Sequence, residues 1–280
     1  MVERLSFWKM HGLGNDYIVI DNMDDRIRSR EMPELAMRLC RRRFSVGADG
    51  LIFACPSKNA DVRMRIFNPD GSEAEMCGNG IRCLAKFCYE NHIVTKKSFT
   101  VETLAGTRNV WLTINSSDME VASVKVDMGE PAFNREAIPM LGTGTFINEE
   151  LKVNGTNFRA TCLSVGNPHC VIFVEDVENV SLSQLGPLIE NHELFPRRVN
   201  VEFVQIISPV EIKVRVWERG VGETLACGTG ACASVVAGCK LGKTGSRVKV
   251  NLSGGTLTVH YDGRIFMDGP AVKVFAGTLF

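Results

Sequence analysis

The sequence predicts an α+β fold with two pseudo-symmetric domains, each a rolled, mostly antiparallel sheet around a central helix. A strand, a loop, a cysteine and a glycine-opened helix follow one another at 62–91 and again at 212–239, with Cys77 and Cys227 150 positions apart. The segment 231–239 is apolar or small on every side, as in a helix that is buried all round. Many short strands around one enclosed helix imply a sheet that curls around it.

The first half alternates strands and helices. Pro33, in the first turn, and the apolar Leu35 and Leu39 predict a helix at 32–42. The arginines at 41–43 lie where a helix end favours cations and are interpreted as solvated side chains. The other elements expected in this half are a helix at 79–91 and strands at 17–21, 51–54, 62–67, 98–103, 109–114 and 120–127.

The second half restarts the same order. A Gly-Asn turn at 166–167 precedes an apolar strand, as the turn at 14–15 does in the first half. The elements expected here are a helix at 181–191 and strands at 171–174, 199–204 and 211–217.

Glycine and proline are frequent at 129–160, so this stretch is expected to be rich in loops. The predicted domains are therefore 1–123 and 124–267. The C-terminal segment 268–280 is expected to return to the first domain.

Length and composition limit the function classes. A chain of 280 residues fits two domains of ordinary size. Its 32 basic and 32 acidic residues give no net charge, which argues against nucleic acid or an anionic membrane as the main partner. No apolar run is long enough to cross a bilayer. The ten cysteines are diluted in a chain with an ample core and no secretory segment, which argues for a reducing cytoplasm. They include no Cys-x-x-Cys pair, which argues against the usual zinc, iron–sulfur and thioredoxin spacings.

Each of the two cysteines precedes a glycine-opened helix. Unpaired N–H groups and the helix dipole favour negative charge there, so the position favours thiolate over thiol. Glycines also let a carboxylate approach the backbone closely. A buried, inert cysteine beside a tight turn is the alternative for one copy, and the duplication favours the reactive interpretation.

Two thiols on opposite walls of a cleft suit the inversion of a carbon stereocentre. One sulfur removes the Cα proton as thiolate, and the other delivers a proton to the opposite face. Backbone amides at Gly78, Asn79, Gly228 and Thr229 could stabilise the developing charge through the α-carboxylate. No lysine stands in a recognisable pyridoxal-phosphate setting and no metal motif is evident, so the hypothesis is a mechanism without a cofactor.

Four blocks of sequence together resemble the diaminopimelate epimerase family, namely 11–16, 67–80, 166–170 and 218–230. They occur in the family's order and spacing along nearly the whole chain. The resemblance implies interconversion of LL- and meso-2,6-diaminopimelate for lysine and peptidoglycan precursor synthesis, without pyridoxal phosphate. It also implies an active site in the cleft between two similar domains and, commonly, a homodimer.

The same resemblance assigns roles to individual residues. Cys77 and Cys227 become the acid–base pair, with His169 and Glu218 near the reacting centre. The residues that it places around the substrate are Asn15, Asn68, Gly78, Asn79, Asn167, Asn200, Glu218, Arg219, Gly228 and Thr229. Two positions depart from the pattern: some members carry glutamine at Gly50, and some carry serine at Thr229.

Other interpretations remain open at this point. The scaffold resembles that of proline and hydroxyproline racemases, although Glu218 and Arg219 favour a substrate with a second amino-acid end. Cys77 and Cys227 could instead form a redox-switched disulfide in a binding protein. Asn15 and Asn167 could serve only their turns. The remaining cysteines are interpreted as small core residues, namely Cys40, Cys55, Cys83, Cys88, Cys162, Cys170, Cys232 and Cys239. His92, His192 and His260 are interpreted as structural or surface residues.

Overall fold

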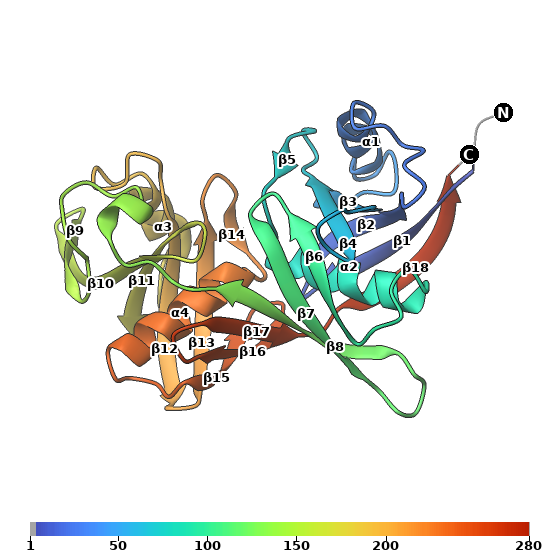
Figure 1. Cartoon of the computed structure of the whole chain (residues 1–280). Helices are drawn as coiled ribbons and strands as arrows, with labels where there is room; N and C mark the ends of the chain where they lie inside the picture. The colour runs from blue at the N-terminus through green and yellow to red at the C-terminus, as the bar shows by residue number, and fades with distance from the viewer. Residues whose placement is uncertain (1–3, 280) are drawn as a thin grey trace. The chain divides into compact units, whose positions relative to one another are not determined.

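The computed structural model describes residues 4–279, which form four α-helices, one short 3₁₀-helix and eighteen strands (Figure 1). The helices are α1 (Met32–Leu39), α2 (Gly78–Glu90), η1 (Arg135–Ala137), α3 (Leu182–Glu190) and α4 (Gly228–Lys240). The strands are β1 (Leu5–Gly12), β2 (Asn15–Asp21), β3 (Gly50–Cys55), β4 (Val62–Phe67), β5 (Glu73–Ala74), β6 (Ser98–Thr103), β7 (Gly106–Ile114), β8 (Val121–Gly129), β9 (Glu149–Val153), β10 (Thr156–Ser164), β11 (Pro168–Val174), β12 (Asn200–Ser208), β13 (Glu211–Glu218), β14 (Gly222–Thr224), β15 (Arg247–Leu252), β16 (Gly255–Tyr261), β17 (Ile265–Gly269) and β18 (Val272–Leu279).

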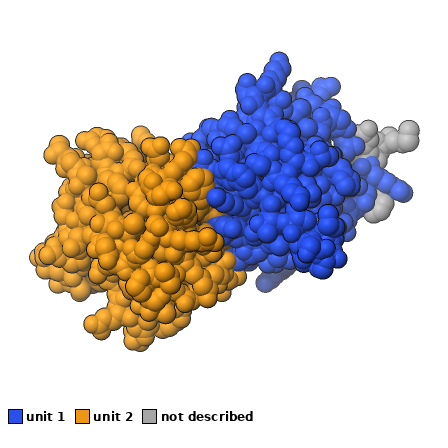
Figure 2. Space-filling view, turned by 60° about the horizontal axis from the view of Figure 1, so that its bottom comes forward, with its two compact units in different colours: residues 1–127, 268–280 blue, residues 128–267 orange. Residues whose placement is uncertain are grey.

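The chain divides into two compact units (Figure 2). Unit 1 consists of two segments, one that ends at Asp127 and one that begins at Asp268. Unit 2 comprises Met128–Met267. The chain passes from unit 1 to unit 2 within β8 and returns within β17.

In unit 1 the sheet surrounds α2. Strand β1 pairs with β18 and β2, and the sheet continues through β3, β4, β6 and β7 to β8. Only β2–β3 and β4–β6 are parallel among these pairs. Helix α2 contacts β1, β2, β3, β4 and β7, and its residues 78–88 are all buried. The shorter α1 packs on β3 and β4.

Unit 2 repeats this order of pairings. Strand β10 pairs with β9 and β11, and the sheet continues through β12, β13 and β15 to β16. Here β11–β12 and β13–β15 are the parallel pairs, at the places that correspond to those in unit 1. Helix α4 contacts six strands of this sheet, from β10 to β16. The predicted α+β class, with mostly antiparallel sheets and few helices, is confirmed.

The stretch 129–160 is more ordered than its composition predicts. It contains η1, all of β9 and the start of β10. Asn154 and Gly155 join β9 to β10 with positive φ angles of 46° and 81°, and Val153 pairs with Thr156 across them. Asn-Gly is the favoured two-residue hairpin turn, so the signal was present in the sequence. Strands β1, β5 and β14 to β18 were also not predicted.

No helix in residues 4–279 combines the length and the hydropathy that a membrane-spanning helix needs.

Candidate active site

Each unit places a cysteine at the N-cap of its enclosed helix. Cys77 and Cys227 both have extended backbone conformations, with φ and ψ of −139° and 123° and of −115° and 111°. Each sulfur accepts a hydrogen bond from the amide three residues on, Gly80 N or Gly230 N, at 3.4 Å. The sulfur therefore lies against the first turn of the helix, where the dipole stabilises negative charge.

Little space is left for a side chain at Gly80 and Gly230, because a strand side chain packs on each helix turn. A Cβ atom on Gly80 would lie 3.1 Å from Ile52 Cδ1, and one on Gly230 would lie 2.7 Å from Glu202 Oε1. Ile52 and Glu202 occupy corresponding positions on β3 and β12. The two halves therefore share the same backbone but place different side chains behind the cysteine.

In unit 1, polar side chains from β2 and α2 surround Cys77. The Tyr17 hydroxyl lies 2.9 Å from Cys77 Sγ and also donates a hydrogen bond to Asn15 Oδ1. Asn79 Nδ2 donates to the same Asn15 oxygen at 3.3 Å, and Cys77 Sγ lies 3.9 Å from it. The structure thus brings together Asn15, Cys77, Gly78 and Asn79, as expected from the sequence, and adds Tyr17.

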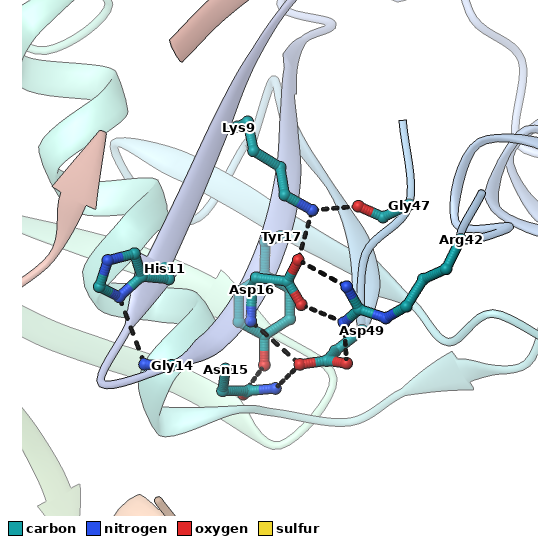
Figure 3. A network of polar contacts seen from close by, with 9 residues as sticks. All are labelled: Lys9, His11, Gly14, Asn15, Asp16, Tyr17, Arg42, Gly47 and Asp49. Carbon is teal, nitrogen blue, oxygen red and sulfur yellow. Dashed lines mark hydrogen bonds and ion pairs between the residues drawn. The ribbon is translucent and has the colours of Figure 1, made fainter. Parts of the chain in front are cut away.

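A network of charged side chains holds the Asn15 amide group through Asp49 (Figure 3). Asp49 Oδ2 accepts hydrogen bonds from Asn15 Nδ2 at 2.9 Å and from the Asp16 amide at 3.1 Å. Arg42 donates to both Asp16 and Asp49, and Lys9 pairs with Asp16. Burial by itself would raise the pKa of Asp16, but the hydrogen bonds from Arg42 and Lys9 lower it to about 2.

Arg42 is exposed, as interpreted from the sequence, but it also pairs with Asp16 and Asp49, which the sequence did not predict. The arginine run does follow α1, but the chain then turns so that the guanidinium reaches Asp16 on β2. That contact depends on tertiary structure and not on the helix end.

Arg82 was also missed, although an arginine inside a buried helix is a signal. It is fully buried and donates to Gly78 O at 2.9 Å, to Asn79 Oδ1 at 2.8 Å and to Pro270 O at 3.1 Å. Because the Asn79 oxygen accepts from Arg82, its NH₂ group faces Asn15. Arg82 therefore orients the amide of the residue that follows Gly78.

In unit 2, a chain of hydrogen bonds leads from Cys227 into the core. Cys227 Sγ lies 3.4 Å from Thr229 Oγ1, which accepts from Asn167 Nδ2 at 3.2 Å. His169 Nε2 lies 2.9 Å from Asn167 Oδ1, and its Nδ1 lies 2.7 Å from Glu202 Oε1. Glu202 was not predicted, although a carboxylate inside the apolar strand around Val201 and Phe203 was a readable signal.

Carboxylates surround Cys227 more closely than Cys77. Burial, Glu218 and Glu202 raise the pKa of the Cys227 thiol well above its ordinary value, against the smaller effects of Thr229 and the Gly230 amide. Burial also raises the pKa of Glu218, although hydrogen bonds from Thr224 and Cys227 oppose this. The Thr224 hydroxyl donates to Glu218 Oε1 at 2.6 Å. These surroundings favour the thiol form of Cys227 over the thiolate.

Three further binding residues were expected from the sequence: Asn200 is the buried first residue of β12, whereas Arg219 and Asn68 lie on exposed loops. Asn200 accepts from the Arg219 amide at 2.9 Å and donates to Pro168 O at 2.8 Å, so it joins two segments of unit 2. The exposed Arg219 donates to Arg197 O. Asn68 lies on an exposed loop of unit 1 and donates to Ser72 Oγ at 2.9 Å.

The structure explains why position 50, where some family members carry glutamine, is a glycine in this chain. It pairs with Tyr17 across β2 and β3. A Cβ atom at this position would lie 3.0 Å from Phe67 O and 3.2 Å from Tyr17 Cε1. The space for a side chain is thus occupied by the ring of Tyr17.

All ten cysteines carry free thiols. Of the eight interpreted as core residues, Cys239 is only half-buried and the other seven are buried. Among residues 4–279, no three His, Cys, Asp or Glu side chains converge as metal ligands would.

The chain matches one protein family over most of its length. The model of the family described as Diaminopimelate epimerase covers residues 7–134 and 161–274. The diaminopimelate epimerase of Moorella thermoacetica is 51% identical over 277 residues, 98% of each chain. The diaminopimelate epimerase of Methanothermobacter thermautotrophicus is 54% identical over 281 residues, again 98% of each chain.

Solved structures of more distant proteins share the fold. A Bacillus anthracis phenazine biosynthesis protein of the PhzF family has a TM-score of 0.70 at 19% identity, over 100% of both chains. A probable proline racemase from Agrobacterium radiobacter K84 has a TM-score of 0.73 at 16% identity, over 99% of this chain and 93% of that one. At such identities the likeness concerns the fold alone.

Proposed function

This chain belongs to the diaminopimelate epimerase family, and from that premise we propose that it converts LL-2,6-diaminopimelate to meso-2,6-diaminopimelate by a two-base thiol mechanism. The reaction serves lysine and peptidoglycan precursor synthesis. The observation that carries the mechanism is the repeated N-cap cysteine, Cys77 on α2 and Cys227 on α4. The substrate is a small molecule, and the proposed mechanism uses no cofactor.

The chemistry is a proton exchange at one carbon. A thiolate takes the Cα proton, the electron pair of the broken C–H bond stays on the substrate, and the other thiol gives its proton to the opposite face. The sulfur that began as thiolate ends as thiol, and its partner ends as thiolate, so atoms and charge balance. The reverse reaction uses the same groups with exchanged roles.

Electrostatic stabilisation must support the carbanion, because one general base typically supplies only about 10²–10⁴-fold. The amides at Gly78 and Asn79 and at Gly228 and Thr229 lie in the first turns of α2 and α4, beside the sulfurs. We assign them to the α-carboxylate at the reacting centre. His169, at the end of the hydrogen-bond chain from Cys227, and Glu218 act near the same centre.

The distal end of the substrate carries a second amino and carboxylate group. Arg219 is exposed and can grip a carboxylate bidentately, and Glu218 can pair with an ammonium. The amide side chains that we assign to the same task, with either group as partner, are those of Asn15, Asn68, Asn167 and Asn200. A site lined in this way discriminates against substrates that leave its polar groups unpaired.

The remaining assignments extend from the same proposal. One thiol is assigned to each face of the reacting carbon. The enzyme acts in the cytoplasm as a homodimer.

Incubation of the reduced protein with LL-diaminopimelate in deuterated water tests the activity. Deuterium should enter one α-position, and Cys77→Ala and Cys227→Ala should each abolish epimerisation with unchanged circular dichroism. Cys239→Ala, which removes a half-buried thiol at the far end of α4, is the matched control and should stay active. Exchange with proline but not with diaminopimelate would support the racemase alternative, and full activity of either alanine variant would contradict two-base chemistry.

A further inference from the structure

The two cysteines have different neighbours at corresponding positions. Strand pairing aligns Tyr17 with Gly50, and it aligns His169 with Asn200 in the other unit. Two residues further along β3 and β12 stand Ile52 and Glu202. The buried His–Glu pair behind Cys227 is thus replaced in unit 1 by a tyrosine and an apolar residue, and the tyrosine hydroxyl reaches the sulfur directly.

The orientation of the Asn15 amide is fixed by its partner. A carboxylate only accepts hydrogen bonds, so the Asn15 atom that faces Asp49 Oδ2 at 2.9 Å is the NH₂ group. The Asn15 oxygen then points toward Tyr17, Asn79 and Cys77, as Figure 3 shows for Tyr17. That oxygen cannot donate.

The Tyr17 hydroxyl can donate its one hydrogen in either of two directions. The phenol has one hydrogen and two possible acceptors, Asn15 Oδ1 and Cys77 Sγ. When Cys77 is a thiol, its S–H can point to the phenol oxygen while the phenol hydrogen stays on Asn15. When Cys77 is a thiolate it has no hydrogen, and the phenol hydrogen is then the donor that lies nearest, 2.9 Å away.

We propose that Tyr17 is a positioning residue whose hydroxyl turns from Asn15 to Cys77 whenever that sulfur becomes a thiolate. The inference rests on the proposed acid–base role of Cys77. It makes the two halves non-equivalent: the negative charge in unit 1 is stabilised by a neutral phenol, whereas the sulfur in unit 2 faces Glu218 and Glu202. Burial raises the pKa of Tyr17 well above its ordinary value, so the phenol keeps its hydrogen in neutral solution.

The geometry in unit 2 supports the contrast. The Thr229 hydroxyl accepts from Asn167 and therefore has its hydrogen available to Cys227, but at 3.4 Å it is a more distant partner than Tyr17 is to Cys77. Resting thiolate is accordingly placed on Cys77, and resting thiol on Cys227.

Tyr17→Phe tests the proposal, with Tyr89→Phe on the same helix as Cys77 as the matched control. Alkylation by iodoacetamide is followed by peptide mass spectrometry across pH, separately at Cys77 and at the half-buried Cys239, which serves as the internal reference. Loss of one charge-assisted hydrogen bond should raise the pH midpoint of Cys77 alkylation by about one unit, a tenfold change in thiolate fraction. The Cys239 profile and the Tyr89→Phe profile should not move.

A milder substitution at Tyr17 tests the same proposal if Tyr17→Phe fails to fold. Replacement of Tyr17 by 3-fluorotyrosine strengthens the phenol as a donor at nearly constant size, and the Cys77 midpoint should move down. An unmoved midpoint, or a shift in the opposite direction, would overturn the role of Tyr17. Failure of the acid–base role itself is seen separately, as epimerisation that persists in Cys77→Ala.

Discussion

His169 Nδ1 lies 2.7 Å from Glu202 Oε1, and both side chains are closed to solvent. His169 Nε2 lies 2.9 Å from Asn167 Oδ1. The other Glu202 oxygen is buried and has no hydrogen-bond partner. Leaving such an atom unpaired is costly.

Glu202→Gln should make Cys227 easier to ionise. The carboxylate is one cause of the raised pKa of Cys227, so its removal should lower the pH midpoint of Cys227 alkylation. Epimerisation should also fall, because the substitution removes the carboxylate that pairs with His169 Nδ1. Glu178→Gln, at an exposed ion pair with Lys213, is the control and should leave both measurements unchanged. A Cys227 midpoint that rises in Glu202→Gln would show that the carboxylate does not act on the sulfur.

Gly230→Ala should disturb the same carboxyl by steric contact. The new methyl group would start 2.7 Å from Glu202 Oε1, and overpacking typically costs about 1–3 kcal/mol. Chemical denaturation should show a loss of this size, together with reduced kcat. Gly245→Ala has its nearest neighbour at 3.6 Å and should change neither quantity. Equal effects of the two substitutions would refute the close packing of Glu202 on α4.

Asp16→Asn should weaken unit 1 at neutral pH. The pKa of Asp16 is lowered from 3.8 to about 2, so the contribution is present above about pH 4 and is lost as the pH falls through about 2. Water screens the half-exposed Arg42, which reduces the expected loss in unfolding free energy to about 1–2 kcal/mol. Urea titrations at pH 7 and near pH 2.5 should differ less for the variant than for the wild type. The exposed Asp24→Asn is the control.

Arg219→Ala should act on substrate binding. Its guanidinium is exposed and its backbone amide is held by Asn200, so truncation should raise KM for diaminopimelate while the fold is kept. Arg264→Ala, which removes another exposed arginine of unit 2, should leave KM unchanged. An unaltered KM in Arg219→Ala would remove its proposed role at the distal carboxylate.

Sequence alone predicted what lies close along the chain. The N-cap positions of Cys77 and Cys227 follow from a strand, a turn and a glycine-opened helix, all of which are local patterns. Tyr17, Asp49 and Glu202 could not be assigned in this way. The contacts of Asp49 with Asn15 and of Glu202 with His169 depend on the register of parallel strands, and that of Tyr17 with Cys77 depends on the packing of α2 on β2. These contacts join residues that are 33 to 60 positions apart.

The fold shows the same division. The spans of the helices and of nine of the eighteen strands were predicted to within a few residues, because apolar periodicity and turn residues mark them. Strand β18 was not predicted because its side chains are mostly exposed and show no alternation of burial. The difference between Tyr17 with Ile52 and His169 with Glu202 became meaningful only when the repeated pairings showed these positions to correspond.

Isotope transfer during a single turnover tests the two-base claim most directly. LL-diaminopimelate is mixed with excess enzyme in deuterated water, and the reaction is quenched before the product is converted back to the substrate. Two thiols predict that the meso product carries deuterium at the inverted carbon, while the unreacted substrate carries none. Meso product that retains the substrate's own hydrogen at that carbon would mean that one base serves both faces, and would contradict the roles given to Cys77 and Cys227.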